Sequence, residues 1–598
     1  MTSHLTETQL RIGSEYLSII PLGAGQEVGR SCIIVKFHGK SIMLDCGIHP
    51  AETGEGQLPF FDEIDPSTID VVLISHFHLD HIGAVPYFCT KTSYTGPVYM
   101  THPTRAVFRM LMSDFLRQAT EAPIFNESNL EDSLKRITAV QYHQVCEFAG
   151  LRFWCYNAGH VLGACMWMIE FAGTRVLYTG DFSRHEDRHL CAAETPNIRP
   201  DVVICESTYG ISTHRPREER EQQLTDNVGR TIRRGGKVLM PVFALGRAQE
   251  LLLVLDEYWD LNPDLQQFNL FYASSLAQRC MPLFRSSINS MNEQIQEQFN
   301  IRNPFIFKHV KQLKETVAFD QTRPCVVMAS PGMLQSGLSR ELFDLWCTDD
   351  KNMVLLPGYS VAGTLAKTLQ SDPLQVTLSD GRRVGRKIEI VSNISFSAHS
   401  DSVQTKEFIS ETNPRHVVLV HGESNEMIRF QNDLKKQFGK LGMGIHAPKN
   451  ISGVKLRFKQ DRVALVRGSL AETASKGGRI DGVLVQDGLD LSIVAPEDIG
   501  AETGVEPVSV ISTVRLPRPN GDVGEILGAL PLDVEKLDDG KWRVANVEVV
   551  DEGDDGEIVL DWESSLVDDL VVDAISIALL KGQDIVDYSN AFCKECSK

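Results

Sequence analysis

The sequence of 598 residues contains no apolar run that approaches the roughly 20 residues needed for a transmembrane helix. Its first sixteen residues are polar, so we expect neither a secretory signal peptide nor a membrane span. Apolar residues make up 42% and charged residues 23% of the chain, as in an ordinary globular protein. This length is sufficient for roughly three or four domains.

The chain also lacks a disulfide framework. Its 13 cysteines are scattered singly, apart from Cys593 and Cys596 near the C-terminal end. Because this pair has no second pair to match it, we do not expect it to form a zinc knuckle. Dispersed cysteines in odd number favour a reducing compartment, either the cytosol or the nucleus.

Basic residues are scarce in one region only. The net charge is −20, and residues 469–598 account for most of it, with 28 acidic and 10 basic residues. The rest of the chain carries a net charge of −2. Because phosphate binding depends on local basic surface, the acidic region is a poor nucleic-acid surface, whereas the remainder is compatible with one.

Four potential metal ligands follow the apolar run Val71–Ile74 within a few residues. Such a run predicts a strand buried on both faces, and Pro86 suits the first turn of a helix just beyond it. The ligands would then lie at the carboxyl end of a strand, where α/β sheets bind their ligands. A histidine-rich surface loop is the alternative, but this spacing after a buried strand favours a zinc site. The four residues are His76, His78, Asp80 and His81.

Four later apolar runs end in the same way. A single histidine or carboxylate at the end of a strand is usually structural, but four of them favour a shared site. These runs end at His160, Asp181, Glu206 and His421. The segment 17–47 reads as three strands that end at Asp45, which suits either a supporting role near the metal or an ordinary turn.

Two further regions have patterns of their own. Between Glu206 and about residue 395, strands, glycine turns and amphipathic helices alternate, which predicts a separate parallel sheet. The segment 393–401, which contains His399, would return the chain to the first domain. Beyond residue 454 the sequence predicts strands at 454–458, 506–516, 542–550 and 557–562, an acidic solvated turn at 551–557, and an amphipathic helix at 566–580.

The stretch from His76 to His81 resembles the signature of the metallo-β-lactamase superfamily. Together with the later motifs, residues 17 to about 450 resemble the β-CASP nucleases of that superfamily. The resemblance implies an α/β fold: a metallo-β-lactamase αββα sandwich with an inserted β-CASP α/β domain and a C-terminal α+β region. We therefore expect a metallo-β-lactamase domain in two parts (1–209 and 395–468), a β-CASP domain (210–394) and an acidic C-terminal partner-binding domain (469–598).

The resemblance also implies two zinc ions and a role for each ligand. His76, His78 and His160 would hold one ion, Asp80, His81 and His421 the other, and Asp181 would bridge both. A shared carboxylate offsets the repulsion between two neighbouring cations. The expected catalytic residues are His399 as general acid, Glu206 as its orienting partner, and Asp80, which is also a ligand.

Substrate expectations follow from the same resemblance. Histidine at position 421 is the form found in RNA-processing members, whereas DNA-repair members commonly carry valine there. Arg247 and Lys367 are candidates for gripping RNA, although Arg247 could equally form a structural ion pair between domains. The most similar members cleave pre-mRNA at the 3′-end processing site before polyadenylation, leaving a 3′-hydroxyl. The alternative is the catalytic endonuclease of the Integrator complex, which acts on the 3′ ends of small nuclear RNA.

The expected partners are RNA, a catalytically inactive homologous subunit and scaffold proteins of the 3′-end processing complex, with a nuclear location. Three other functions fit the sequence less well. A small-substrate hydrolase would lack the insertion, a non-catalytic scaffold would have lost ligands, and a 5′-exonuclease of the ribonuclease J type would have a different terminal domain.

Overall fold

The computed structural model describes residues 6–581, with short gaps. The gaps are 11–15, 119–122, 172, 244, 314–319, 321, 393, 395, 397, 459–461, 477–478, 488–489, 505–509 and 554–555. Cys593 and Cys596 therefore lie outside the described residues. The larger of two compact units comprises Gln9–Val463 with Gln486–Leu491, and the smaller holds the rest of the described chain. Within the described residues, no helix combines the length and the apolar character that a bilayer crossing requires.

Two seven-stranded sheets form the centre of the larger unit. The first has the order β23-β2-β3-β4-β5-β6-β7 and the second the order β22-β21-β12-β11-β10-β9-β8. Buried side chains such as Ile33 and Val35 from the first sheet share one apolar core with Trp167 and Ile169 from the second. The strands of the first sheet are β2 (Tyr16–Gly23), β3 (Cys32–Phe37), β4 (Lys40–Leu44), β5 (Val71–Leu73), β6 (Val98–Thr101), β7 (Ile137–Val140) and β23 (Val454–Arg457). Those of the second are β8 (Cys146–Phe148), β9 (Leu151–Asn157), β10 (Cys165–Phe171), β11 (Thr174–Tyr178), β12 (Val202–Glu206), β21 (His416–Val420) and β22 (Gly444–His446).

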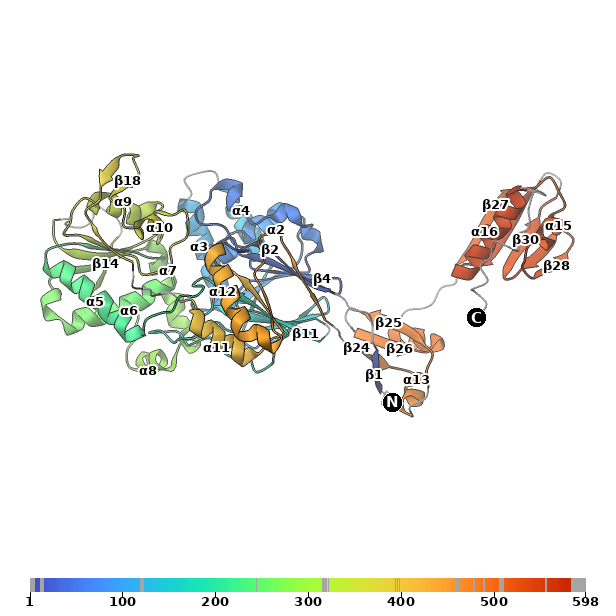
Figure 1. Cartoon of the computed structure of the whole chain (residues 1–598), viewed down its shortest axis with the longest axis horizontal. Helices are drawn as coiled ribbons and strands as arrows, with labels where there is room; N and C mark the ends of the chain where they lie inside the picture. Colours follow the sequence, from blue (N-terminus) through green and yellow to red (C-terminus); the bar gives the residue numbers. More distant parts are fainter. Residues whose placement is uncertain are drawn as a thin grey trace. The chain divides into compact units, whose positions relative to one another are not determined.

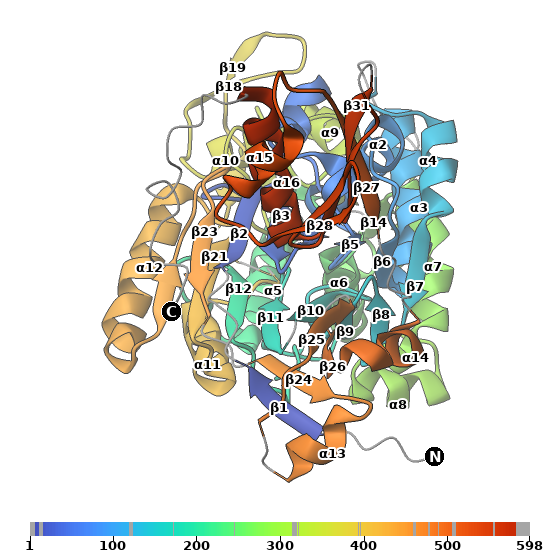
Figure 2. The same ribbon diagram turned by 90° about the vertical axis from the view of Figure 1, so that its right-hand side faces the viewer.

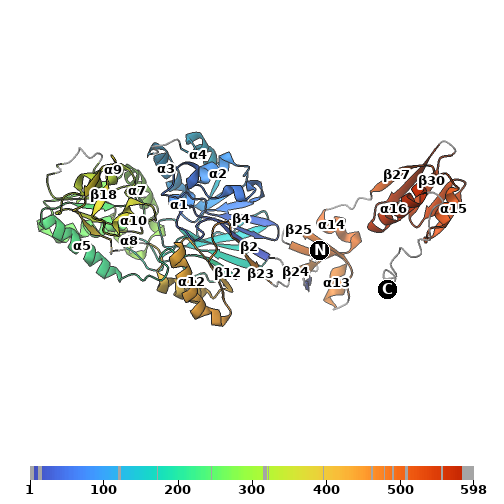
Figure 3. The same cartoon turned by 45° about the horizontal axis from the view of Figure 1, so that its top comes forward.

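Helices cover the outer face of each sheet, which completes the predicted αββα sandwich (Figures 2 and 3). Apolar residues of α2, α3 and α4 pack on the first sheet, and those of α11 and α12 pack on the second. These helices are α1 (Leu79–Ile82), α2 (Val85–Lys91), α3 (His102–Gln118), α4 (Glu127–Leu134), α11 (Ser402–Thr412) and α12 (Ser424–Phe438). As predicted, Pro86 lies in the first turn of α2.

The insertion has its own sheet, drawn in green and yellow in Figure 1. This six-stranded sheet has the order β15-β14-β16-β13-β17-β20, and all its pairings are parallel, as the sequence predicted. Apolar cores lie on both of its faces. Its strands are β13 (Val238–Pro241), β14 (Asn269–Ala273), β15 (Val310–Gln312), β16 (Cys325–Ala329), β17 (Met353–Leu355) and β20 (Glu389–Val391), beside a small hairpin of β18 (Gln375–Thr377) and β19 (Arg383–Gly385). Its helices are α5 (Arg217–Arg233), α6 (Arg247–Leu261), α7 (Ser275–Ser286), α8 (Glu293–Ile301), α9 (Gly337–Trp346) and α10 (Leu365–Leu369).

The C-terminal region forms most of two more sheets, the first of which also includes the N-terminal strand β1. The first has the order β1-β24-β26-β25 and the second the order β27-β31-β30-β29-β28. Helix α16 packs its apolar face on the five-stranded sheet. The elements are β1 (Thr6–Leu10), β24 (Arg462–Val466), α13 (Leu470–Ser475), β25 (Val483–Asp487), β26 (Asp490–Val494), α14 (Ile499–Thr503), β27 (Ile511–Pro517), α15 (Val523–Gly528), β28 (Val534–Asp538), β29 (Lys541–Val544), β30 (Val547–Asp551), β31 (Glu557–Glu563) and α16 (Leu566–Lys581).

One predicted strand, 542–550, is wrong. It is a hairpin of β29 and β30, because Ala545 between them has a φ of 52° and turns the chain back. Alanine rarely adopts a left-handed backbone conformation, and the sequence has no glycine or Asn-Gly pair at this point that would indicate a turn. The α+β character of the region is as predicted, whereas the four predicted domain limits stay predictions.

Candidate metal centre and active site

The ends of five strands converge at one edge of the sandwich. His76 follows β5 of the first sheet, and the other strands belong to the second sheet. In that sheet β11, β12 and β21 are parallel neighbours, with Glu206 opposite Val420. Their carboxyl ends therefore bring Asp181, Glu206 and His421 to the same edge, as the repeated strand endings predicted.

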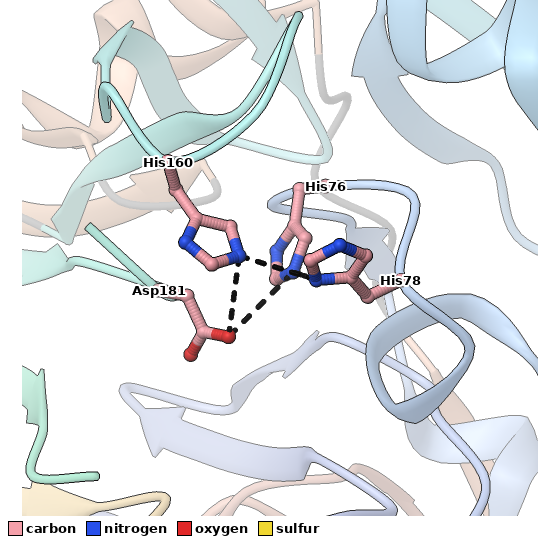
Figure 4. A group of neighbouring side chains, drawn as sticks. All are labelled: His76, His78, His160 and Asp181. Carbon is pink, nitrogen blue, oxygen red and sulfur yellow. Dashed lines mark hydrogen bonds and ion pairs between the residues drawn. The ribbon is translucent and has the colours of Figure 1, made fainter. Parts of the chain in front are cut away.

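Three imidazoles and one carboxylate form a first cluster, which comprises His76, His78, His160 and Asp181. Figure 4 shows the four side chains pointing toward one another. The Nδ1 of His78 lies 3.0 Å from Nε2 of His76 and 3.1 Å from Nε2 of His160. The Oδ2 of Asp181 lies 3.6 Å and 3.7 Å from the same two Nε2 atoms.

Burial keeps the three imidazoles of the first cluster neutral. It lowers the pKa of His78 to about 4 and the pKa values of His76 and His160 well below the usual value of a histidine. Neighbouring histidines add to the effect at His76, because each would repel a second positive charge. All three imidazoles are therefore unprotonated at neutral pH, which is the form that binds metals.

A second cluster shares Asp181 with the first. The Nε2 of His421 lies 3.3 Å from Nε2 of His81 and 3.3 Å from Oδ2 of Asp80. Asp181 reaches His81 with Oδ2 and His421 with Oδ1, each at 3.3 Å. Burial alone would lower the pKa of His81, but Asp181, Asp80 and Asp45 together raise it well above the usual value. This cluster is thus rich in carboxylates, whereas the first is rich in imidazoles.

Hydrogen bonds to the outer ring nitrogens fix which nitrogen faces inward. The Nδ1 of His160 donates to the carbonyl of Ala398 at 2.8 Å, and the Nδ1 of His81 lies 2.7 Å from Oδ2 of Asp45. Carbonyl and carboxylate oxygens only accept, so each Nδ1 carries the proton. Each Nε2 therefore faces the cluster: that of His160 carries a lone pair, and that of His81 can bind a metal ion once its proton is displaced.

Asp45 supports both clusters from behind. Its carboxylate accepts hydrogen bonds from the backbone N–H of Ser75 at 2.6 Å, the Ser75 hydroxyl at 2.7 Å and the Tyr178 hydroxyl at 2.7 Å. Because the Ser75 hydroxyl donates to Asp45, its oxygen is free to accept from Nδ1 of His76 at 3.0 Å. The supporting role predicted for Asp45 therefore has a structural basis, and it extends through Ser75 to the first cluster.

His399 and Glu206 form a pair beside Asp181. The Nδ1 of His399 lies 2.7 Å from Oε2 of Glu206 and 3.9 Å from Oδ2 of Asp181. Burial would lower the pKa of His399, but the charges of Glu206 and Asp181 raise it to about 9. His399 is therefore protonated at neutral pH in the metal-free protein. Asp401, two residues later, caps α11 by accepting from the N–H groups of Val403 and Gln404, which fixes the segment.

Thr208, which has no distinguishing signal in the sequence, connects this pair to the second cluster. Its hydroxyl lies 2.5 Å from Oε2 of Glu206 and 3.0 Å from Nδ1 of His421. A hydroxyl has one proton, and the shorter contact to a carboxylate takes it. The oxygen can then accept from Nδ1 of His421, which holds the ring with its Nε2 toward Asp80 and His81.

The donor set fits zinc. Ligands about 2.0–2.1 Å from a tetrahedral zinc ion lie about 3.3 Å from one another, and the close nitrogen and oxygen pairs within the two clusters are separated by 3.0–3.8 Å. Among the described residues, the buried Oδ1 of Asp181 meets the geometry of no hydrogen bond. Converging lone pairs and a buried carboxylate are costly without a cation. A third grouping, of Asp181, Glu206, His399 and His421, also has metal-binding spacing.

The two predicted RNA-gripping residues are both engaged with carboxylates. The Nη1 of Arg247 lies 2.7 Å from Asp187 and 2.7 Å from Glu250, and the Nζ of Lys367 lies 3.4 Å from Glu423. Asp187 precedes the insertion and Arg247 lies within it. The structure therefore favours the alternative reading of Arg247 as an ion pair between the two parts.

A cavity of about 200 Å³ opens onto the clusters. Residues of both clusters line it on one side, among them His78, Asp80, Asp181 and His421. Residues of the insertion line the other side, including Phe243, Met333 and Tyr359. A substrate bound to the metal centre is therefore enclosed in part by the insertion.

The fold and the clusters define a metallo-β-lactamase hydrolase with a β-CASP insertion. Models of four protein families match the chain accordingly. They are the metallo-beta-lactamase superfamily domain (34–204), the Beta-Casp domain (248–369), the Zn-dependent metallo-hydrolase RNA specificity domain (383–448) and the pre-mRNA 3′-end-processing endonuclease polyadenylation factor C-terminal domain (478–597). Members of this superfamily depend on metal ions.

Full-length relatives specify the family further. The chain is 45% identical to cleavage and polyadenylation specificity factor 73 of Drosophila melanogaster over 585 residues, which cover 95% of this chain and 85% of the relative. It is 46% identical to cleavage and polyadenylation specificity factor subunit 3 of Dictyostelium discoideum (95% and 75% covered) and 43% identical to endoribonuclease ysh1 of Schizosaccharomyces pombe (95% and 76% covered). The chain belongs to this family of metallo-β-lactamase endoribonucleases.

Proposed function

We propose that this chain is the zinc-dependent endoribonuclease that cleaves pre-mRNA at the 3′-end processing site before polyadenylation. The observation that carries the proposal is the pair of clusters around Asp181, set beside the His399–Glu206 pair in one cavity. The relatives matched over 95% of the chain bear the names of 3′-end processing factors and endoribonucleases. They give no support to the alternative, the Integrator endonuclease.

In this proposal each cluster holds one zinc ion. The first would be held by His76, His78 and His160, the second by Asp80, His81 and His421, and Asp181 would contact both. Bound zinc lowers the pKa of a water molecule and stabilises negative charge on a scissile phosphate. The chain contributes the unprotonated ring nitrogens, and its buried carboxylates offset the charge of the ions.

His399 supplies the proton for the leaving group. Cleavage that yields a 5′-phosphate and a 3′-hydroxyl breaks the bond between phosphorus and the 3′-oxygen, and this oxygen must gain a proton. Because Nδ1 of His399 is bonded to Glu206, the transferable proton sits on Nε2 of a residue that lines the cavity. Glu206 holds the ring and stabilises its charge, which is the arrangement of an oriented general acid.

We further propose that the chain acts in the nucleus, within a 3′-end processing complex, with a catalytically inactive homologous subunit and scaffold proteins as partners. The acidic region 469–598 is the proposed partner-binding domain, following the divisions at 1–209, 210–394 and 395–468. Support comes from the match of residues 478–597 to the endonuclease-specific C-terminal family. Removal of 469–598 should leave a folded, zinc-loaded core that a pull-down no longer recovers with the complex.

The test of the function is cleavage of end-labelled pre-mRNA by the purified chain, alone and with its partner subunit. An internal cut whose upstream product can be extended by poly(A) polymerase is expected, because that enzyme requires a 3′-hydroxyl. Single nucleotides released from one end would instead indicate an exonuclease. Asp181→Ala serves as the inactive control on the same RNA.

A further inference from the structure

The cavity that opens onto the two side-chain clusters has little positive charge from lysine or arginine. Among its lining residues, Arg247 alone carries a permanent positive charge, and that charge is held by Asp187 and Glu250. Its remaining walls on the insertion side are mostly apolar or aromatic. An RNA strand that enters it therefore meets few side-chain cations, and contacts other than ion pairs with its phosphates must contribute to binding.

Phe243 is the most exposed large apolar side chain in this wall. It follows β13, and 49% of its surface is exposed, although Val242 before it and Leu245 two residues after it are only 3% and 4% exposed. Its ring centroid lies 6.0 Å from that of His78, with an angle of 35° between the planes. The fold thus holds an uncovered aromatic ring directly beside a candidate zinc ligand.

The backbone around Phe243 restricts where the ring can lie. A Cβ at Gly332 would approach the Phe243 nitrogen to 3.2 Å and its Cδ2 to 3.5 Å, so Gly332 supports the ring closely from one side. A Cβ at Gly246, whose φ is 98°, would lie 3.6 Å from Nε2 of His78. These close approaches keep the loop against His78 and the exposed ring in the cavity wall.

We propose that Phe243 is a stacking platform for the nucleobase next to the scissile phosphate. The inference rests on the proposed function, because it assumes that a phosphodiester of single-stranded RNA occupies the metal clusters. Unpaired bases are held by stacking on aromatic side chains, with little preference among the bases. Phe243 therefore positions the substrate without reading its sequence, and the base takes the place that solvent occupies on the ring.

The protein-side test compares Phe243→Ala, Phe243→Trp and Leu345→Ala in the full-length zinc-loaded chain, in the assembly that cleaves. Loss of a stacked base lowers affinity by ~5–150-fold, so Phe243→Ala should lower kcat/KM by that factor, mainly through KM. Phe243→Trp should retain activity. Leu345 on α9 is 57% exposed and does not line the cavity, so Leu345→Ala should match wild type. Zinc content and Tm should be unchanged in all three.

The substrate-side test removes the base instead of the ring. On an RNA with an abasic residue next to the cleavage site, the kcat/KM of the wild type should fall by about the same factor as Phe243→Ala lowers it on intact RNA. On the abasic RNA, Phe243→Ala should then have the same kcat/KM as the wild type. An equal penalty for Phe243→Ala on both RNAs, or no penalty on either, would overturn the proposal.

A binding measurement separates this inference from the proposed function. 2-Aminopurine placed at the same position should lose fluorescence when wild type binds the RNA, because stacking quenches it, and should lose much less with Phe243→Ala. This signal requires no cleavage. Quenching without cleavage would count against the endonuclease function alone, whereas cleavage with equal quenching by both proteins would count against the platform alone.

Discussion

The two clusters of candidate metal ligands differ in the charge of their histidines, although they share Asp181. The first consists of neutral imidazoles whose pKa values burial has lowered. The second places His81 among three carboxylates, which raise its pKa well above the usual value. Without metal, the first cluster therefore contains lone pairs that face each other, whereas the second is stabilised by an internal ion pair. The difference implies that the two sites load metal by different routes.

Replacement of the shared ligand should have the largest effect. Asp181→Ala removes the carboxylate that contacts histidines of both clusters, so elemental analysis should find at least one of two zinc ions missing and RNA cleavage undetectable. Wild-type protein should contain about two zinc ions per chain. A folded wild-type protein without zinc would contradict both the site and the comparison.

His399→Ala should affect the chemistry and leave both clusters intact. We expect turnover to fall by ~10²–10⁴-fold, the usual contribution of a general acid, with zinc content and Tm near those of wild type. The third grouping of possible ligands includes His399, which makes zinc analysis of this variant decisive. If an ion is lost with the side chain, His399 is a ligand and its assigned role is wrong.

Asp45→Asn should weaken the second cluster more than the first. The substitution keeps the shape of the side chain but removes the charge that orients His81 at 2.7 Å. Loss of such a partner typically costs ~10–100-fold in metal affinity. Competition with a chromophoric chelator should show one weakened zinc and one nearly normal zinc. If both sites are weakened equally, Ser75 transmits the loss of charge to His76 as strongly as the direct contact transmits it to His81.

Thr208→Val should have a smaller effect of the same kind, about 10-fold on affinity for the second ion. Valine removes the hydroxyl that fixes the proton of His421, while Thr208→Ser keeps it. Recovery by serine in both zinc affinity and turnover is expected. If serine fails as valine does, the methyl group matters and the hydroxyl does not.

The smallest expected effect is a difference between the two sites in the number of protons released when zinc binds. At pH 7 the metal-free His81 is protonated because its pKa is raised, so zinc must displace that proton, whereas His78, with a pKa of about 4, has none to lose. Calorimetric titration in buffers of different ionisation enthalpy measures this. His78→Ala, which retains the second site, should release about one proton per zinc, and His421→Ala, which retains the first, close to none.

The sequence indicated that the candidate ligands converge, because several of them stand at or just beyond the end of an apolar run. His76, Asp181 and His421 follow strands that are buried on both faces, and hydrophobic periodicity detects such strands directly. Parallel strands share an edge, so convergence followed from topology alone. The separate parallel sheet of the insertion was predicted on the same grounds.

What the sequence did not reveal depends on contacts between distant segments. Thr208 and Tyr178 resemble ordinary loop and strand residues, and only the fold places their hydroxyls on Glu206 and Asp45. Arg247 offered two interpretations until its partner Asp187 was located, 60 residues away in the sequence. Side-chain hydrogen bonds across such separations leave no periodic signal.

The parallel pairing of β12 with β21 joins Glu206 to a strand that begins 210 residues later. During synthesis at about 5–20 residues per second, His421 therefore emerges roughly 20–70 seconds after His76. All ligands of the first cluster have been made by Asp181, long before the second cluster can be complete. The growing chain therefore passes through a period in which only the first of the two candidate sites exists, and a metal ion captured then would be bound before the second site can form.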